Sequence, residues 1–429
     1  MERGSKMRLE LGIIEIDDVQ FGDETRVEGG TLFVNKEELI DLALQDDRLA
    51  AADVELARPG EGVRIIPVKD VIEPRVKVSG PGEIFPGMIG KVGTVGSGST
   101  NVLRGAALVT VGRIVGFQEG LIDMSGPGAP YSPFSRTNNV ALILHPTAGL
   151  APHAHEEALR LAGLRAAAYL GEAGKDVAPD EVEVYELSPV TDAALPRVAY
   201  VHPLLAQGLL HDTYLYGVDA KKILPTLIHP NEVMDGAIVS GNCVSACDKH
   251  TTYHHVNNAV IHELYRRHGQ DLNFIGVVIT NLMVTLAGKE RASDYASNLA
   301  KLIGAQGAIV TNEGFGNPDT DLMMLCQKMK GYGIETVLIT DEFAGRDGGS
   351  QSLADATPEA SAVISVGNAN EVVALPPMKR TIGDLKPAEV IAGGFAGCMA
   401  ADGGLNVEIQ GIMGSTCQLG LGRLTARGY

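Results

Sequence analysis

Short apolar runs separated by glycine and proline turns dominate residues 1–140. The runs have strand-like lengths and cover residues 11–16, 31–34, 63–67, 76–78, 91–95 and 107–115. One further segment, 36–44, reads as a helix because it follows Asn35, a residue type that commonly caps helix N-termini. The glycine-rich stretch 93–98 lacks both the dinucleotide spacing and a Gly-Lys-Ser ending, so it predicts a loop between strands and no nucleotide cofactor.

The middle of the chain predicts a smaller α/β part. An Ala/Leu-rich segment, 155–170, is typical of a helix, and strands are expected at 182–187 and 197–201. The next segment, 221–227, leads through His229-Pro230 toward a polar stretch near residue 242.

After residue 243 helices and strands alternate regularly. Helices are predicted at 256–268, 292–303, 320–329 and 351–354, and strands at 274–280, 307–311, 336–340 and 362–366. The expected fold class is α/β, with a beta-rich N-terminal part followed by a largely parallel, doubly wound C-terminal part. The predicted domains are 1–150, 151–242 and 243–429.

Polar residues follow several of the predicted C-terminal strands. Ligands bind at the carboxyl edge of open parallel sheets, so Glu313 and Asp341, which lie at two such strand ends, are candidates to face a pocket. The alternative interpretation is that both side chains cap helices.

Composition narrows the function classes. The chain has 429 residues, and its 45% hydrophobic fraction excludes general disorder. A formal net charge of -18 argues against nucleic acid or an anionic membrane as partner, although local basic residues could still bind a small anionic substrate. Five scattered cysteines do not form a disulfide framework, which favours a reducing cytoplasm. We identify no signal peptide and no apolar run of membrane-spanning length.

The most distinctive chemistry lies at Gly241-Asn242-Cys243. The Cys243 thiol is placed to attack the Asn242 carbonyl and convert the amide to a thioester; elimination and hydrolysis would then leave a pyruvoyl group in place of the cysteine. Such a group is an electrophile that no ordinary side chain supplies. The dipeptide alone favours a simpler interpretation, a turn followed by a buried cysteine.

The sequence around this motif changes that interpretation. Residues 235–244, with the following segments 251–253, 257–258 and 263–265, closely resemble the proprotein of glycine, sarcosine and betaine reductase component B. The resemblance covers nearly the whole chain, because it continues at 7–16, 26–27, 271–274, 276–277, 280–281, 284–287 and 289–291. The D-proline reductase proprotein is a more distant relative.

The resemblance implies a cut between Asn242 and Cys243, after which both pieces stay associated as alpha and beta subunits. The second piece then carries a covalent pyruvoyl group derived from Cys243, whose carbonyl condenses with a substrate amine and weakens its C–N bond. The implied activity is an oxidoreductase of the glycine, sarcosine or betaine type, performing reductive deamination. Betaine strains this scheme because a quaternary nitrogen forms no imine.

The resemblance also implies partners. The family places the attacking selenolate in a separate selenocysteine-containing component B subunit, and a small selenoprotein, component A, belongs to the same system. The chain itself holds and activates the amine, and a higher oligomer is expected.

Candidate site residues surround the cleavage position: Gly241, Asp248, Lys249, His250 and Thr252. His250 either transfers protons during processing or is a solvated histidine. Lys249 either attracts a substrate carboxylate or a thiolate, or is a surface charge. Asp248 and Thr252 are expected to form walls of the site. Cys247 is expected to do the same, because processing would consume the Cys243 thiol with which it could pair.

The histidines crowded beside the cleavage position resemble a metal cluster. They include one i, i+4 pair, but they lack the HExxH pattern and an obvious third ligand, so no metal is expected; they are His250, His254, His255, His262 and His268.

Three hypotheses remain open from the sequence. The first is the self-processed pyruvoyl subunit of an amino-acid reductase. The second is a pyruvoyl enzyme of different chemistry, such as D-proline reduction or decarboxylation. The third is a noncatalytic scaffold whose motif stays uncut, or is cut by Asn242 cyclisation and keeps an ordinary N-terminal cysteine.

Overall fold

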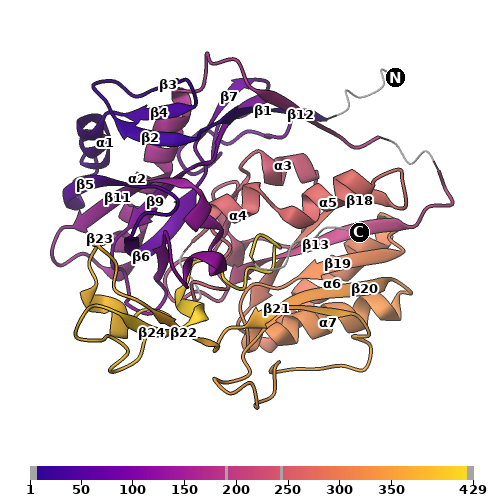
Figure 1. Cartoon of the computed structure of the whole chain (residues 1–429). Coiled ribbons are helices and arrows are strands. Elements are labelled where there is room, and N and C mark those ends of the chain that lie inside the picture. The colour runs from indigo at the N-terminus through magenta and orange to yellow at the C-terminus, as the bar shows by residue number, and fades with distance from the viewer. Residues whose placement is uncertain (1–6, 189–191, 242–244, 423–429) are drawn as a thin grey trace.

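The structure is a computed structural model that describes residues 7–188, 192–241 and 245–422 (Figure 1). The described residues form the mixed α/β fold that the sequence predicts. Asn242 and Cys243 lie outside them. None of the helices in these ranges combines the length and the apolar character needed to cross a bilayer.

The N-terminal half forms two sheets packed against helix α2 (Pro152–Glu172), which contacts strands of both. The four-stranded sheet has the order β12-β1-β8-β7, formed by Glu181–Glu186, Arg8–Glu15, Gly98–Arg104 and Arg75–Ser79. The six-stranded sheet has the order β10-β6-β9-β11-β5, formed by Gly120–Asp123, Val63–Ile72, Ala106–Val111, Asn138–Pro146 and Leu49–Ala57. Its sixth strand, β23 (Arg380–Gly383), comes from near the C-terminus and pairs in parallel with β6.

The second six-stranded sheet has the order β16-β18-β13-β19-β20-β21. Its neighbouring pairs are parallel except at the edge strand β16. The strands are Thr226–Ile228, Asn273–Met283, Arg197–Ala206, Gly307–Thr311, Glu335–Glu342 and Val363–Asn368. Two of them, β13 and β16, precede residue 243, so strands from both sides of that position share one sheet. The division into domains at residues 150 and 242 stays a prediction.

The strand order of this sheet reverses at β13. The chain passes from β13 to β18 on one side and later enters β19 on the other side. Ligands of open parallel sheets bind beyond the carboxyl ends of the strands at such a reversal. Here those ends are Ala206 and Thr311.

Three small sheets and six more helices complete the fold. The small sheets are β15-β14-β17 (Val218–Asp219, Tyr214–Leu215, Ile238–Val239), β2-β4-β3 (Asp18–Phe21, Thr31–Val34, Arg26–Glu28) and β22-β24 (Val372–Leu375, Leu405–Glu408). The helices are α1 (Lys36–Ala43), α3 (Pro230–Met234), α4 (Thr252–Val256), α5 (Ala259–Arg267), α6 (Leu286–Leu302) and α7 (Asn317–Gly331). Asn35 caps α1 as predicted, since its side chain accepts hydrogen bonds from the backbone N–H groups of Glu37 and Glu38.

Three predicted elements differ from the structure. The helix expected at 256–268 is confirmed as α5, but it begins later, at Ala259, because Asn258 caps it, while the preceding short helix α4 ends with Asn257 as its C-cap. Residues 91–95 form no strand, and residues 351–354 form no helix. Both segments lie among glycines, which favour turns over regular elements.

Helix α2 also brings charge into the core. Glu156 is fully buried, and its Oε1 lies 3.0 Å from Lys69 Nζ and 3.2 Å from Arg160 Nε. Burial opposes ionisation of Glu156, but the two cations outweigh it and lower its pKa to about 2. This ion cluster ties α2 to strand β6.

Candidate functional site

Thr252 fixes the chain just before Asn242-Cys243, the position that the sequence predicts to be cut and that is called the cleavage position below. Its hydroxyl donates to Asp70 Oδ2 at 2.8 Å, and its backbone N–H donates to Asp70 Oδ1 at 3.1 Å. The Thr252 oxygen in turn accepts a hydrogen bond from the backbone N–H of Ser240 at 3.1 Å. All three residues are buried. Strand β6, helix α4 and the segment leading to residue 242 are therefore locked together.

Gly241 sits where a larger residue does not fit. A Cβ atom at this position would lie 1.8 Å from the backbone oxygen of Asp212 and 2.5 Å from its carbonyl carbon. Asp212 cannot easily give way, because its own carboxylate accepts a hydrogen bond from Gly208 N–H and pairs with Lys221. The glycine before the cleavage position is thus required by packing.

The chain after the cleavage position forms a tight turn against a segment near the C-terminus. The Ser245 carbonyl accepts hydrogen bonds from the N–H groups of Asp248 and Lys249 at 3.1 and 3.0 Å. The Cys247 N–H donates to Gln410 at 3.2 Å, and Gly414 N–H donates to Ala246 at the same distance. The C-terminal segment therefore supports the turn that carries the predicted site residues.

Two buried carboxyl groups, Asp248 and Asp341, form the first part of a polar centre. The Thr416 hydroxyl lies 3.3 Å from Asp248 and 3.1 Å from Asp341, while Gln418 Nε2 donates to Asp341 at 3.0 Å. The Cys247 thiol donates to Asp248. Burial raises the pKa of both carboxyl groups, and the nearby charge of Asp248 raises that of Asp341 further. Such a pair is suited to hold and transfer a proton.

A histidine cluster forms the second part of the centre. His250, His255 and Glu313 each offer one ligand atom, and these atoms all lie within 4.8 Å of one another. Glu313 also accepts hydrogen bonds from the N–H groups of His250 and Leu205 at 3.2 Å, so it spans the reversal between β13 and β19. Burial lowers the pKa of His250 to about 3, lowers that of His255 well below its usual range, and raises that of Glu313 to about 8.

These positions settle several alternatives from the sequence. Glu313 and Asp341 face the polar centre and cap no helix, since Gly316 is the N-cap residue of α7. His250 and Lys249 are 0% and 2% exposed, so neither the solvated histidine nor the surface charge is correct. Lys249 Nζ donates to the backbone oxygen of Lys69.

The other histidines of the run have separate partners. His254 Nδ1 is held by Thr251, so the predicted i, i+4 pair with His250 is replaced by a contact between His250 and His255. His262 Nδ1 lies 3.0 Å from the Tyr185 hydroxyl, and His268 Nδ1 accepts from Phe274 N–H. Of these five histidines, His250 and His255 therefore lie together, whereas the other three contact different residues.

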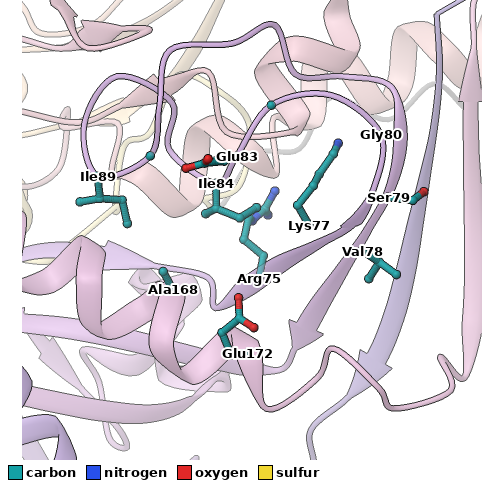
Figure 2. Close-up of a pocket in the computed structure, with 12 residues that line it drawn as sticks. Arg75, Lys77, Val78, Ser79, Gly80, Glu83, Ile84, Ile89, Ala168 and Glu172 are labelled. Atoms are coloured by element: carbon teal, nitrogen blue, oxygen red, sulfur yellow. The ribbon is translucent and has the colours of Figure 1, made fainter.

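A surface cavity of about 440 Å³ lies elsewhere, between strand β7 and helix α2, and shares no lining residue with the polar centre. Figure 2 shows Arg75 and Lys77 in it, with Glu172 reaching it from α2. Both cations already have acidic partners, Glu73 for Arg75 and Asp235 for Lys77. The cavity therefore offers less free positive charge than its lining suggests.

The sequence missed contributors that come from far along the chain. Thr416 and Gln418 reach the centre from the C-terminal segment, and His202 and Tyr200 reach it from β13. Nothing in their local sequence marks them; only the strand-end position of Glu313 and Asp341 gave a usable signal.

Comparison with known proteins gives a match over almost the whole chain. Residues 7–427 match the family model for glycine/sarcosine/betaine reductase component B subunits. Among curated proteins of Peptoclostridium acidaminophilum, the glycine reductase complex component B subunits alpha and beta are 59% identical over 428 residues, covering 99% of this chain and 100% of that protein. The sarcosine reductase complex component B subunit alpha shows the same identity and coverage.

More distant relatives follow. The betaine reductase complex component B subunit alpha of the same organism is 39% identical over 422 residues, covering 94% of this chain and 95% of that protein. The predicted distant relative, the D-proline reductase proprotein, is confirmed at 23% identity over 351 residues in Acetoanaerobium sticklandii, covering 75% of this chain and 53% of that protein. No solved structure matches.

Proposed function

The chain belongs to the family of glycine/sarcosine/betaine reductase component B subunits, and we propose that it is a self-processing precursor of two such subunits. Its relatives are named as subunits of reductase complexes, so the chain is an oxidoreductase subunit. The proposal adds that the chain is cut between Asn242 and Cys243 and that Cys243 becomes a pyruvoyl group.

One observation carries this proposal. A single protein covered over 100% of its length by this chain bears the name of two subunits, alpha and beta. One polypeptide that yields two subunits must be divided, and Asn242-Cys243 offers the chemistry for the division. The Cys243 sulfur attacks the Asn242 carbonyl and displaces the amide nitrogen, which gives a thioester. Elimination then breaks the bond between sulfur and the Cys243 Cβ, so the sulfur leaves on Asn242 as a thiocarboxylate, which water converts to a carboxylate and sulfide. The dehydroalanine left at residue 243 is hydrolysed to the ketone, and its nitrogen leaves as ammonia.

The surroundings of this position fit a reactive carbonyl. Asp248 is buried five positions after Cys243, and its Oδ2 has no hydrogen-bond partner within the described ranges. A ketone needs nearby groups that can give and take protons while its oxygen and the substrate nitrogen change charge. The Asp248–Asp341 pair offers such a group, because burial raises the pKa of both carboxyl groups above their ordinary values.

When present, a pyruvoyl ketone condenses with a primary or secondary amine and makes its nitrogen a better leaving group. The surrounding residues then have distinct tasks in the proposal. Lys249 provides the positive charge that attracts the substrate carboxylate, and Asp248 and Asp341 hold the transferable proton. Thr252 and Gly241 fix the backbone at the new chain ends.

The substrate follows from the same chemistry. Glycine and sarcosine carry a primary and a secondary amine, whereas the quaternary nitrogen of betaine cannot condense with a ketone. The relatives named for glycine and sarcosine are both 59% identical to this chain, against 39% for the one named for betaine. We therefore assign the chain to the glycine or sarcosine type.

The proposal requires partners. The chain contains no selenocysteine, so the reductive attack on the substrate carbon comes from a selenocysteine-containing component B subunit, with the small selenoprotein component A acting alongside it in a reducing cytoplasm. The two cleaved pieces stay together because their strands interleave: β13 lies between β18 and β19, and β23 pairs with β6.

Reductive trapping tests the proposal. Purified protein is incubated with radiolabelled glycine or sarcosine and treated with borohydride, with Cys243→Ala as the control. The expected result is label on the piece that begins at residue 243 and none on the control. Equal labelling of the control, or no label on cleaved protein, would overturn the pyruvoyl assignment.

A further inference from the structure

Three side chains from separate segments converge beside the carboxyl pair. His250 lies before α4, His255 lies within it, and Glu313 follows β19. His250 Nδ1 is 3.7 Å from Glu313 Oε2, and one ligand atom of each residue falls within 4.8 Å of the others. All three side chains are at most 1% exposed.

The hydrogen bonds of Gln418 define the tautomer of His250. Its amide nitrogen donates to Asp341, so its oxygen faces His250 Nε2 at 3.0 Å and accepts from it. His250 Nε2 therefore carries the hydrogen, and Nδ1 presents a lone pair toward the Glu313 carboxylate. Two acceptors at this distance in a buried site need a proton or a cation between them.

A second hydrogen-bond chain orients His255. Its Nδ1 lies 3.2 Å from His202 Nε2, and His202 Nδ1 lies 3.1 Å from the Tyr200 hydroxyl. Tyr200 accepts from Asn258 and can donate to Thr311 at 3.0 Å. When each donor in this series points toward Thr311, His255 Nδ1 carries the hydrogen and His255 Nε2 keeps a lone pair. This Nε2 atom has no partner within the residues that the structure describes.

This arrangement is the usual support of a metal-binding histidine. The ring nitrogen that does not bind the metal is held by a neighbouring group, which fixes both the ring and its tautomer. His250 is held by Gln418 and His255 by His202. The other candidate group, around Asp248 and Asp341, differs because Cys247, Thr416 and Gln418 already donate to its oxygens.

The charge balance favours a cation as well. Three carboxyl groups, Glu313, Asp248 and Asp341, lie buried together with Lys249 as a neighbouring cation. A divalent ion bound by Glu313 would add positive charge beside these carboxyl groups.

We propose that His250, His255 and Glu313 bind a divalent transition-metal ion, with zinc as the best match. Two imidazoles and one carboxylate form a three-ligand zinc set that leaves a fourth position open for water or a substrate oxygen. Zinc–ligand bonds of about 2.0–2.1 Å would draw the three atoms to roughly 3.4 Å from one another. Calcium and magnesium prefer oxygen ligands and do not suit the imidazoles.

This site departs from the sequence-based expectation of no metal. The histidine run lacks a third ligand nearby, and the structure supplies one in Glu313, which is 63 positions from His250. The inference does not depend on the pyruvoyl proposal, because metal content can be measured on cleaved and uncleaved protein alike.

Metal analysis tests the site directly. The full chain is stripped with a chelator, equilibrated with zinc, freed of excess ion and analysed by elemental mass spectrometry. We expect about one zinc ion per chain, and at least about tenfold weaker binding in His255→Gln and Glu313→Gln. His262→Gln is the matched control, since this histidine belongs to the same run but pairs with Tyr185, and it should bind zinc like the wild type.

A second measurement needs no variant. Cobalt(II) added to the stripped wild-type protein should give the intense d–d absorption of a four-coordinate site, and zinc should displace it. A wild-type chain that binds no zinc, gives only the weak spectrum of the aqueous cobalt ion, or loses nothing in His255→Gln would overturn the proposal.

Discussion

Gly241→Ala is the sharpest perturbation of the chain beside the cleavage position. The added Cβ would start 1.8 Å from the Asp212 oxygen, whereas such contacts are essentially never below 3.0 Å. The backbone must therefore move by at least about 1.2 Å, with an overpacking cost of roughly 3 kcal/mol. An unfolding entropy of about 2.1 cal/mol/K per residue converts this into a melting temperature about 3 °C lower for 429 residues.

The same movement would shift the backbone that leads into the proposed cleavage position, Asn242-Cys243. A misplacement of about 1 Å costs on the order of 10²-fold in rate, so cleavage of Gly241→Ala should be about that much slower. The assays are a thermal melt and a time course of chain cleavage on a denaturing gel.

Gly331→Ala is the matched control for this prediction. Gly331 ends helix α7, has nothing within 4 Å of its would-be Cβ and is solvent-exposed, so this variant should melt at or slightly above the wild-type temperature and cleave normally. If Gly241→Ala matched the wild type in both assays, the close approach to Asp212 and its role in aligning the cleavage position would be wrong.

Three further predictions test the fold around the site. Glu156→Gln should lower the free energy of unfolding by about 3 kcal/mol at pH 7, and the difference should shrink as pH falls from about 4.5 to 2, because the depressed pKa of Glu156 stabilises the fold only while the unfolded carboxyl is ionised. Denaturant titrations across this range measure it, and the half-buried neighbour Glu157, whose ion pair with Arg48 is partly open to solvent, should show a smaller effect in Glu157→Gln. Thr252→Val removes the hydroxyl that donates to Asp70 and leaves only the backbone hydrogen bond, so it should destabilise the fold by about 1–3 kcal/mol, whereas Thr252→Ser should be nearly neutral. Equal stability of the two variants would contradict the hydrogen-bond assignment. In Cys243→Ala, thiol reagents should react only when the protein unfolds, because the four remaining cysteines are buried: Cys247, Cys326, Cys398 and Cys417. A thiol that reacts quickly in the folded variant would refute this.

Much of the fold follows from local sequence. The alternation after residue 256 predicted β18, β19, β20 and α7 within a few residues, because the strands are short apolar runs, largely buried in a parallel sheet, and the longer segment of α7 lies between two of them. The strands β5, β8 and β11 were missed. Polar residues at their ends, such as Asn138 and Asn139, obscure the short apolar stretches, and pairing in the sheet decides their conformation.

Two local signals predicted part of the site. Asp248 and His250 stand close together in the chain, and Glu313 and Asp341 follow predicted strands; the structure brings these four residues into one buried centre. The contributions of Gln418 and His202 depend on the C-terminal segment and on β13 reaching the same centre. Such long-range contacts leave no local pattern, which is why the sequence did not show that Glu313 lies beside His250 and His255.

The most direct test of the account is the intact mass of the purified protein, with and without hydroxylamine. We predict two chains, 1–242 and 243–429, with the second lighter than its cysteine form because a ketone oxygen replaces the thiol and the amine, and shifted to higher mass by hydroxylamine. An undivided chain of 45.1 kDa that stays uncut after addition of the partner subunit would contradict the account. So would a cut chain that keeps an ordinary N-terminal cysteine.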